Sequence, residues 1–241
     1  MKVVKIALGM LVLSALALVP LDADAAVSRK PKILLHVKAT TTKNQCVVPA
    51  ALSGICANTV NQGDLGQAYH MQVIVDLGDS VNTVVTNDPN NGLAGVQFGI
   101  TYPGQFDPAG TTGINIFGWN LCGVLEFAMP GWPGPGTGNL ITWNSVTGCQ
   151  RSRMTTAGYF YMTAYSAGTF QLVPRQVDMP PIAKFADCTS FETALTPGEL
   201  GHAAFSAGAT TTACNPCVVT CPGIVAVQPT TWSSIKALNG R

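Results

Sequence analysis

Short runs of alternating apolar and polar residues, bounded by Gly, Pro, Asn and Asp, constrain this chain more than any other feature. The run Val96–Tyr102 ends at Pro103, and the run Met71–Leu77 ends at Gly78. A period of two places successive side chains on opposite faces of a strand, so these runs indicate half-buried β-strands. Because no long helical periodicity separates them, the sequence predicts an all-β fold, a two-sheet antiparallel β-sandwich.

The same pattern predicts further strands along the chain. They are Lys32–Lys38, Val81–Thr86, Gly113–Trp119, Val124–Met129, Leu140–Trp143, Gly158–Tyr165, Thr169–Val173 and Ile182–Phe185. Residues on the inward faces of such strands form the core of a sandwich. We therefore expect burial of Val73, Val75, Val96, Phe98, Ile100, Phe160 and Met162.

Two segments favour short helices. Thr189–Glu192 has the pattern of a capping box and is cut off by Pro197 and Gly198. In the carboxyl-terminal tail, Trp232, Ile235 and Leu238 recur at three-residue spacing. The sequence predicts a connecting turn of helix at the first and a short helical tail that docks on a surface at the second.

The amino terminus has the pattern of a secretory signal. Lys2 and Lys5 precede the apolar run Ile6–Val19, and Ala23-Asp24-Ala25 supplies a small-x-small cleavage site. The apolar run is too short to span about 30 Å of hydrocarbon as a helix. We expect a signal peptide at 1–25, a single sandwich domain at 26–228 with a disulfide-rich carboxyl-terminal part, and a tail at 229–241. The expected location is secreted (periplasmic, cell-surface or extracellular), without membrane insertion after cleavage.

Eight cysteines follow the signal, at Cys46, Cys56, Cys122, Cys149, Cys188, Cys214, Cys217 and Cys221. An even number in an exported chain indicates disulfides, and we expect folding to require oxidation. Short spans flanked by turn residues favour local closure, which predicts the pairs Cys46–Cys56 and Cys122–Cys149. The other four form two more bridges or a four-thiolate zinc site, and Cys214-x-x-Cys217 also has the spacing of a redox dithiol.

Charged residues make up only 10% of the chain, and the formal net charge is +1. The few Lys and Arg are scattered, so there is no electrostatic footprint for nucleic acid and no polybasic run for an anionic membrane. Both classes of partner are excluded on this ground.

No familiar enzyme signature occurs in the sequence. The three histidines, His36, His70 and His202, stand apart from one another and are expected to be strand or loop residues. Glu126 and Asp107 are the carboxylates most like a glycosidase pair, because such catalysis needs two acids that flank one bond. A secreted hydrolase with dispersed catalytic carboxylates is therefore the alternative to a non-enzymatic protein.

The stretch from Asn44 to Gln150 contains acidic residues but no Lys or Arg. Oxygen ligands suit calcium, and the segments Asn87–Gly92 and Asp76–Asp79 carry them. Since the same residue types build ordinary turns, structural turns are the preferred reading; we expect no cofactor here, with calcium as the alternative.

Aromatic placement offers a candidate ligand-binding surface. Tyr159, Tyr161 and Tyr165 share one face of a predicted strand, while Phe160 and Met162 share the other. If the second face fills the core, the tyrosines form an outward strip suited to stacking on sugar rings, and Trp132 on its Gly/Pro loop is expected to extend it.

The run Gly95-Val96-Gln97-Phe98-Gly99-Ile100-Thr101-Tyr102-Pro103, within residues 68–175, resembles bacterial extracellular β-sandwich modules of the cohesin and carbohydrate-binding type, which share an immunoglobulin-like architecture. The start, Lys32–Val37, and the end, Thr231–Leu238, resemble those of uncharacterised exported bacterial proteins. The resemblance implies a non-enzymatic role in extracellular or cell-surface binding or structure, with a glycan or another surface protein as partner.

Overall fold

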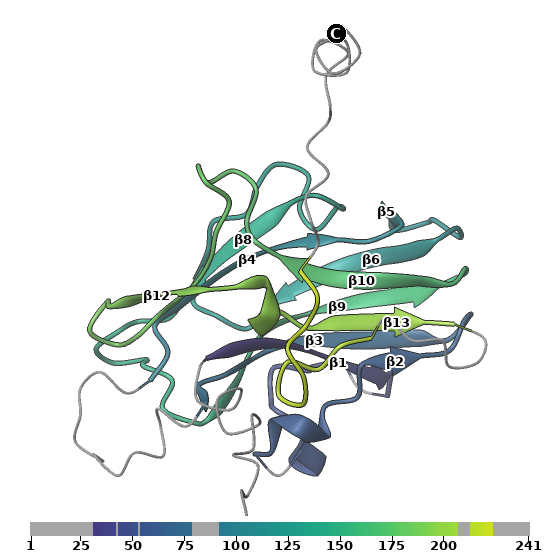
Figure 1. Ribbon diagram of the computed structural model, residues 1–241. Helices are drawn as coiled ribbons and strands as arrows, with labels where there is room; N and C mark the ends of the chain where they lie inside the picture. The colour runs from purple at the N-terminus through teal and green to yellow at the C-terminus, as the bar shows by residue number, and fades with distance from the viewer. Residues whose placement is uncertain (1–30, 42, 53, 79–91, 207–212, 224–241) are drawn as a thin grey trace, which may run out of the picture.

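Two β-sheets pack face to face in the computed structural model, which describes residues 31–41, 43–52, 54–78, 92–206 and 213–223 (Figure 1). The five-stranded sheet has the order β1-β3-β9-β6-β5. The eight-stranded sheet has the order β12-β11-β4-β10-β13-β2, with β8 on the other edge of β4 and β7 beside β8. The predicted two-sheet all-β sandwich is confirmed.

The strands of the five-stranded sheet are β1 (Lys32–Ala39), β3 (Ala68–Asp76), β5 (Gly104–Phe106), β6 (Ile114–Leu121) and β9 (Met154–Ala164). Those of the eight-stranded sheet are β2 (Gln62–Gly63), β4 (Gly95–Thr101), β7 (Leu125–Glu126), β8 (Gly138–Thr142), β10 (Gly168–Val173), β11 (Ala183–Ala186), β12 (Glu192–Leu195) and β13 (His202–Phe205). Three 3-10 turns, η1 (Ala50–Leu52), η2 (Cys56–Asn58) and η4 (Pro197–Glu199), connect them.

Pairing is antiparallel through the middle of both sheets. β3 pairs with β1 on one edge and with β9 on the other. Parallel strand pairs lie at the margins of the described sheets, between β5 and β6 and between β13 and β2. The short strands β2, β5, β12 and β13 were not among the predicted strands, because each run is too short to show alternation.

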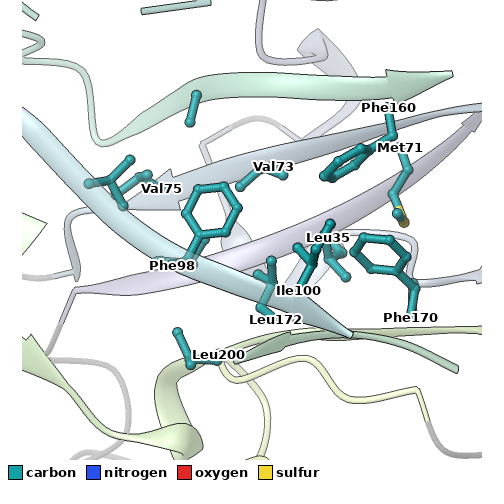
Figure 2. Packing of buried hydrophobic residues seen from close by; sticks show 14 of the residues in the cluster. Leu35, Met71, Val73, Val75, Phe98, Ile100, Phe160, Phe170, Leu172 and Leu200 are labelled. Carbon is teal, nitrogen blue, oxygen red and sulfur yellow. The ribbon is translucent and has the colours of Figure 1, made fainter. Parts of the chain in front are cut away.

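The core lies between the sheets and follows the alternation of the sequence. Phe98 and Ile100 point inward from β4, and Phe98 lies toward Val73 and Val75 of β3 (Figure 2). Every residue predicted to be buried is at most 1% exposed. The predicted register of these strands is therefore confirmed.

The helix predicted at Thr189–Glu192 is wrong. The Asp187 side chain accepts hydrogen bonds from the backbone N–H groups of Thr189 and Phe191, which makes a tight turn. The chain then pairs with β11 as β12, so Glu192 begins a strand. The capping box lies further on, where Thr196 precedes Pro197 and Glu199 in η4.

Four disulfides join all eight cysteines, in the pairs Cys46–Cys122, Cys56–Cys217, Cys149–Cys188 and Cys214–Cys221. The predicted pairs Cys46–Cys56 and Cys122–Cys149 are wrong, and these cysteines form no four-thiolate zinc site. Local closure misleads here because a sandwich brings distant segments together, and the entropic cost of closing a loop rises only slowly with its length. Only Cys214–Cys221 closes a short loop.

Several predictions fall on residues outside the described ones: the signal peptide at 1–25, the strand Val81–Thr86 and the helical tail at 229–241. Within the part of the chain that the structure describes, no helix is long and apolar enough to cross a membrane.

Replacing Phe98 with Ala tests the core. Truncation of a fully buried Phe removes apolar contacts and leaves a cavity, so we expect a loss of about 3 to 5 kcal/mol in the free energy of unfolding. Urea unfolding measures it. Phe191→Ala is the control, because that ring is 68% exposed and its loss should change the free energy little. Equal effects of the two substitutions would contradict the packing.

Peptide mapping without reduction tests the disulfides. The folded protein should yield the linked peptides of Cys46 with Cys122 and of Cys149 with Cys188. It should also contain no thiol that alkylates before unfolding. A Cys46–Cys56 peptide from folded protein would refute this connectivity.

Candidate functional site

The outer face of the five-stranded sheet carries a row of side chains across four neighbouring strands. In the strand register Lys38 of β1 lies opposite His70 of β3, and His70 lies opposite Tyr161 of β9. Phe117 of β6 follows, with its ring 5.1 Å from that of Tyr161, centroid to centroid. We call Lys38, His70, Tyr161 and Phe117 the histidine–tyrosine row.

Phe117 faces outward because it follows Ile116, which points into the core, and side chains alternate along a strand. Its ring lies beside that of Tyr161 on the outer face. The register between β6 and β9 shifts between Ile116 and Gly118, so Phe117 has no residue opposite it. This bulge resets the alternation and turns Trp119 to the core side, where it packs on Phe160.

A covalently held segment covers the neighbouring row. The backbone oxygen of Lys43 accepts a hydrogen bond of 2.7 Å from the Tyr159 hydroxyl, and that of Val47 accepts one of 3.1 Å from Gln72 Nε2. The disulfide from Cys46 to Cys122 holds this segment against the sheet. Tyr159 is only 6% exposed as a result, so it packs beneath residues 43–47 rather than on the surface.

The structure thus separates the four aromatic residues proposed from the sequence. Tyr161 and Tyr165 are each 39% exposed, and Tyr165 follows the end of β9, where its backbone N–H donates to Gly113. Trp132 lies on the core side of β9, with its ring 5.8 Å from Phe160 and 5.2 Å from Trp119. Trp132 therefore does not extend the tyrosine strip as expected.

His70 lies between the two tyrosines of β9, with ring centroids 5.2 Å from Tyr159 and 5.6 Å from Tyr161. Burial, and secondly the positive charge of Lys38, lower the pKa of His70, so its imidazole is neutral near pH 7. Its Nδ1 atom is buried and finds no hydrogen-bond partner among the described residues. A buried polar atom of this kind is commonly satisfied by an ordered water molecule.

The two carboxylates of the hydrolase alternative each have a structural role. Glu126 Oε2 accepts hydrogen bonds from Trp119 Nε1 at 2.9 Å and from Asn139 Nδ2 at 2.7 Å. Asp107 Oδ1 accepts from the backbone N–H of Ala109 at 2.9 Å and closes a turn. Each carboxylate therefore holds its own segment in place.

The calcium candidates divide between described and undescribed residues. The segment from Asp79 to Asn91 lies outside the described residues, so that part stays a prediction. Asp76 is fully buried, and its Oδ1 lies 3.2 Å from Arg153 Nε. Burial raises the pKa of Asp76, opposed by Arg153 and Lys32. Its Oδ2 faces Cys217 of the Cys56–Cys217 bridge. Both carboxylate oxygens of Asp76 therefore contact groups of the protein itself.

Sequence reasoning missed Lys38, His70 and Phe117. His70 was expected to be a strand or loop residue; the structure places it on β3, and its contact with the tyrosines depends on the register between β3 and β9. Lys38 and Phe117 were included in predicted strands. Alternation from Ile116 could have placed Phe117 on the outer face, but its contact with Tyr161 depends on the pairing of β6 with β9.

Comparison with known proteins finds no matching family model and no matching curated protein. Among solved structures, a cohesin module of a family 33 glycoside hydrolase from Clostridium perfringens is similar, with a TM-score of 0.40 and 8% identity over 73% of this chain and 98% of that module. The sixth cohesin of scaffoldin B from Acetivibrio cellulolyticus, solved with a dockerin, has a TM-score of 0.37 and 11% identity over 72% of this chain and 97% of its own. A Clostridium thermocellum cohesin, also solved with a dockerin, has a TM-score of 0.37 and 10% identity over 73% and 99%.

With TM-scores of 0.40 and 0.37, these three structures carry no inference about this chain. At such identities they say nothing of a shared partner. The function proposed below rests on the side chains of this chain.

The neutral histidines of this face predict how stability depends on pH. His36 lies on β1 next to the row, its Nδ1 accepts a hydrogen bond from Val60 N–H, and burial, with a smaller effect of Lys38, lowers its pKa to about 4. In the unfolded chain the pKa of His36 is near 6.5, so on acidification the unfolded chain binds a proton at His36 before the folded protein does. Its contribution to stability is therefore complete above about pH 6.5 and is lost as the pH falls toward 4.

Urea unfolding between pH 7 and 4 measures this dependence. We expect the free energy of unfolding to fall less steeply with acidification in His36→Gln than in the unaltered protein, because Gln does not titrate and its amide oxygen still accepts from Val60. Identical slopes would contradict a neutral, buried His36.

Proposed function

We propose that this protein is an exported, non-enzymatic binding module that holds a glycan on the outer face of its five-stranded sheet. One observation carries the proposal: Tyr161 and Tyr165 remain substantially exposed on a face where Tyr159 is covered. Exposed aromatic rings on a rigid sheet are energetically costly to leave in water and commonly serve recognition.

The chemistry of the row suits a sugar. A tyrosine presents an apolar ring face with a hydroxyl at its edge, and a sugar ring likewise has an apolar face and a hydroxylated edge. Tyr161 and Phe117 meet at an interplanar angle of 43°, so the two rings do not form one flat plate. His70 packs against Tyr161 and is neutral near pH 7, so it brings no charge to the row.

Rigidity supports the same conclusion. The three rings of the row stand on β3, β6 and β9, the central strands of the sheet, and the Cys46–Cys122 bridge fixes the segment beside them. A preorganised site loses little conformational entropy when it binds.

Export is supported by the cysteine chemistry. Four disulfides form and persist in oxidising compartments and are rare in the cytosol. Together with the signal-like amino terminus, they favour a periplasmic, cell-surface or extracellular location.

A glycan array with purified protein tests the proposal. We expect retention of one class of glycan, with Tyr161→Ala and Tyr165→Ala each weakening binding about tenfold or more, which corresponds to about 1.4 kcal/mol. Phe191→Ala removes an exposed ring on the other sheet and is the matched control. Circular dichroism verifies that each variant is folded.

Retention that survives both tyrosine substitutions would place the ligand on another surface. An array with no retained glycan would refute a glycan ligand, and a protein partner on the same face would then be the next hypothesis.

A further inference from the structure

A cleft of about 330 Å³ opens on the outer face of the eight-stranded sheet, on the opposite side of the molecule's core from the histidine–tyrosine row. Its lining is mostly apolar and includes Thr101, Val173, Pro174, Pro181, Pro197 and His202. We call it the β4–β10 cleft. The register brings two lining residues together, because Thr101 of β4 and His202 of β13 both lie opposite Gln171 of β10, one on each side.

The carboxyl-terminal part of the described chain leads to this cleft. Cys214 pairs with His202 through two backbone hydrogen bonds of 3.0 Å, which places the start of the segment beside β13 (Figure 1). The Cys214–Cys221 bridge then turns the chain back, and Cys221 N–H donates to the Gly198 oxygen of η4.

The last described residue lies against the wall of the cleft. A Cβ atom placed on Gly223 would come within 2.8 Å of the Pro197 Cβ atom, and Pro197 lines the cleft. The chain therefore leaves the described structure at the rim of an apolar hollow in its own surface.

The sequence that follows is apolar and carries no acidic residue. Residues 224–241 include Trp232, Ile235 and Leu238, with Lys236 and Arg241 as the only charged side chains. Trp232 lies nine positions after Gly223, and an extended chain of that length spans about 30 Å. The tail is long enough to reach any part of the cleft.

We propose that the carboxyl-terminal tail folds back on its own domain and seats Trp232 in the β4–β10 cleft. An apolar cavity of about 150 Å³ holds a benzene molecule, so a cleft of this volume accommodates an indole and part of an aliphatic neighbour. The tail thereby removes its large ring and the apolar part of the cleft lining from water together.

His202 fits this arrangement. It is buried in the lining, and desolvation lowers its pKa, so near pH 7 it is neutral and brings no charge against the indole. A neutral ring nitrogen is also an acceptor for an indole N–H.

Fluorine NMR of the full chain labelled with 5-fluorotryptophan tests the inference. Trp232→Phe identifies the Trp232 resonance by its loss, while Trp119, Trp132 and Trp143 report on the fold. We expect the Trp232 resonance to lie away from the position of free fluoroindole and to be shielded from a soluble paramagnetic agent.

Thr101→Arg places a charged side chain at the cleft and should release Trp232, moving its resonance to the free position. Thr142→Arg is the matched control, because Thr142 lies on the same face of the same sheet, opposite Gly95 at the other end of β4. It should leave the Trp232 resonance where it is. Unchanged resonances of the other three tryptophans show that each variant is folded.

A Trp232 resonance at the free position in the unaltered protein overturns the inference. So does a Trp232 resonance that does not move in Thr101→Arg. A resonance that shifts with protein concentration assigns the cleft to the tail of a second copy and also overturns it. None of these outcomes bears on the glycan array, which probes the opposite face.

Discussion

The contact between Phe160 and Phe170 joins the two sheets, and other aromatic rings of the core pack on both of these residues. Phe160 points inward from β9 and Phe170 from β10, with ring centroids 5.1 Å apart. Trp119 packs on Phe160 at 4.6 Å, and Tyr102 stacks on Phe170 at 4.9 Å. Because side chains alternate along β9, fixing Phe160 in the core also fixes Tyr161 on the outer face. The same packing that stabilises the fold therefore orients the candidate binding row.

How far the sequence leads depends on the range of the interaction that decides each feature. Alternation is local, so the strands around Val73, Phe98 and Phe160 and their buried faces were predictable. The partners of Cys46 and Cys56 depend on which distant segments the fold brings together, and a local sequence pattern cannot predict such contacts. Thr189–Glu192 has the residue types of a helix start, but pairing between β11 and β12 outweighs a weak local preference.

The candidate site shows the same division. The outward direction of Tyr161 follows from the core position of its neighbours, whereas the burial of Tyr159 depends on a segment more than a hundred residues away that is pinned by a disulfide. Trp132 was expected beside the tyrosines. Its Gly/Pro loop shows no alternation, so the sequence could not indicate which way the side chain points. The structure uses it instead to close the core next to Phe98, at 5.9 Å.

The bridge between Cys56 and Cys217 has a mechanical consequence. It joins two residues 161 positions apart in sequence, so every described strand except β1 lies inside one covalent ring. A load applied between the two ends of the chain passes through the sulfur–sulfur bond and bypasses that ring. A protease that cuts one peptide bond within the ring opens it without releasing a fragment. A protein that is pulled or nicked at a cell surface would keep its sandwich attached on both sides.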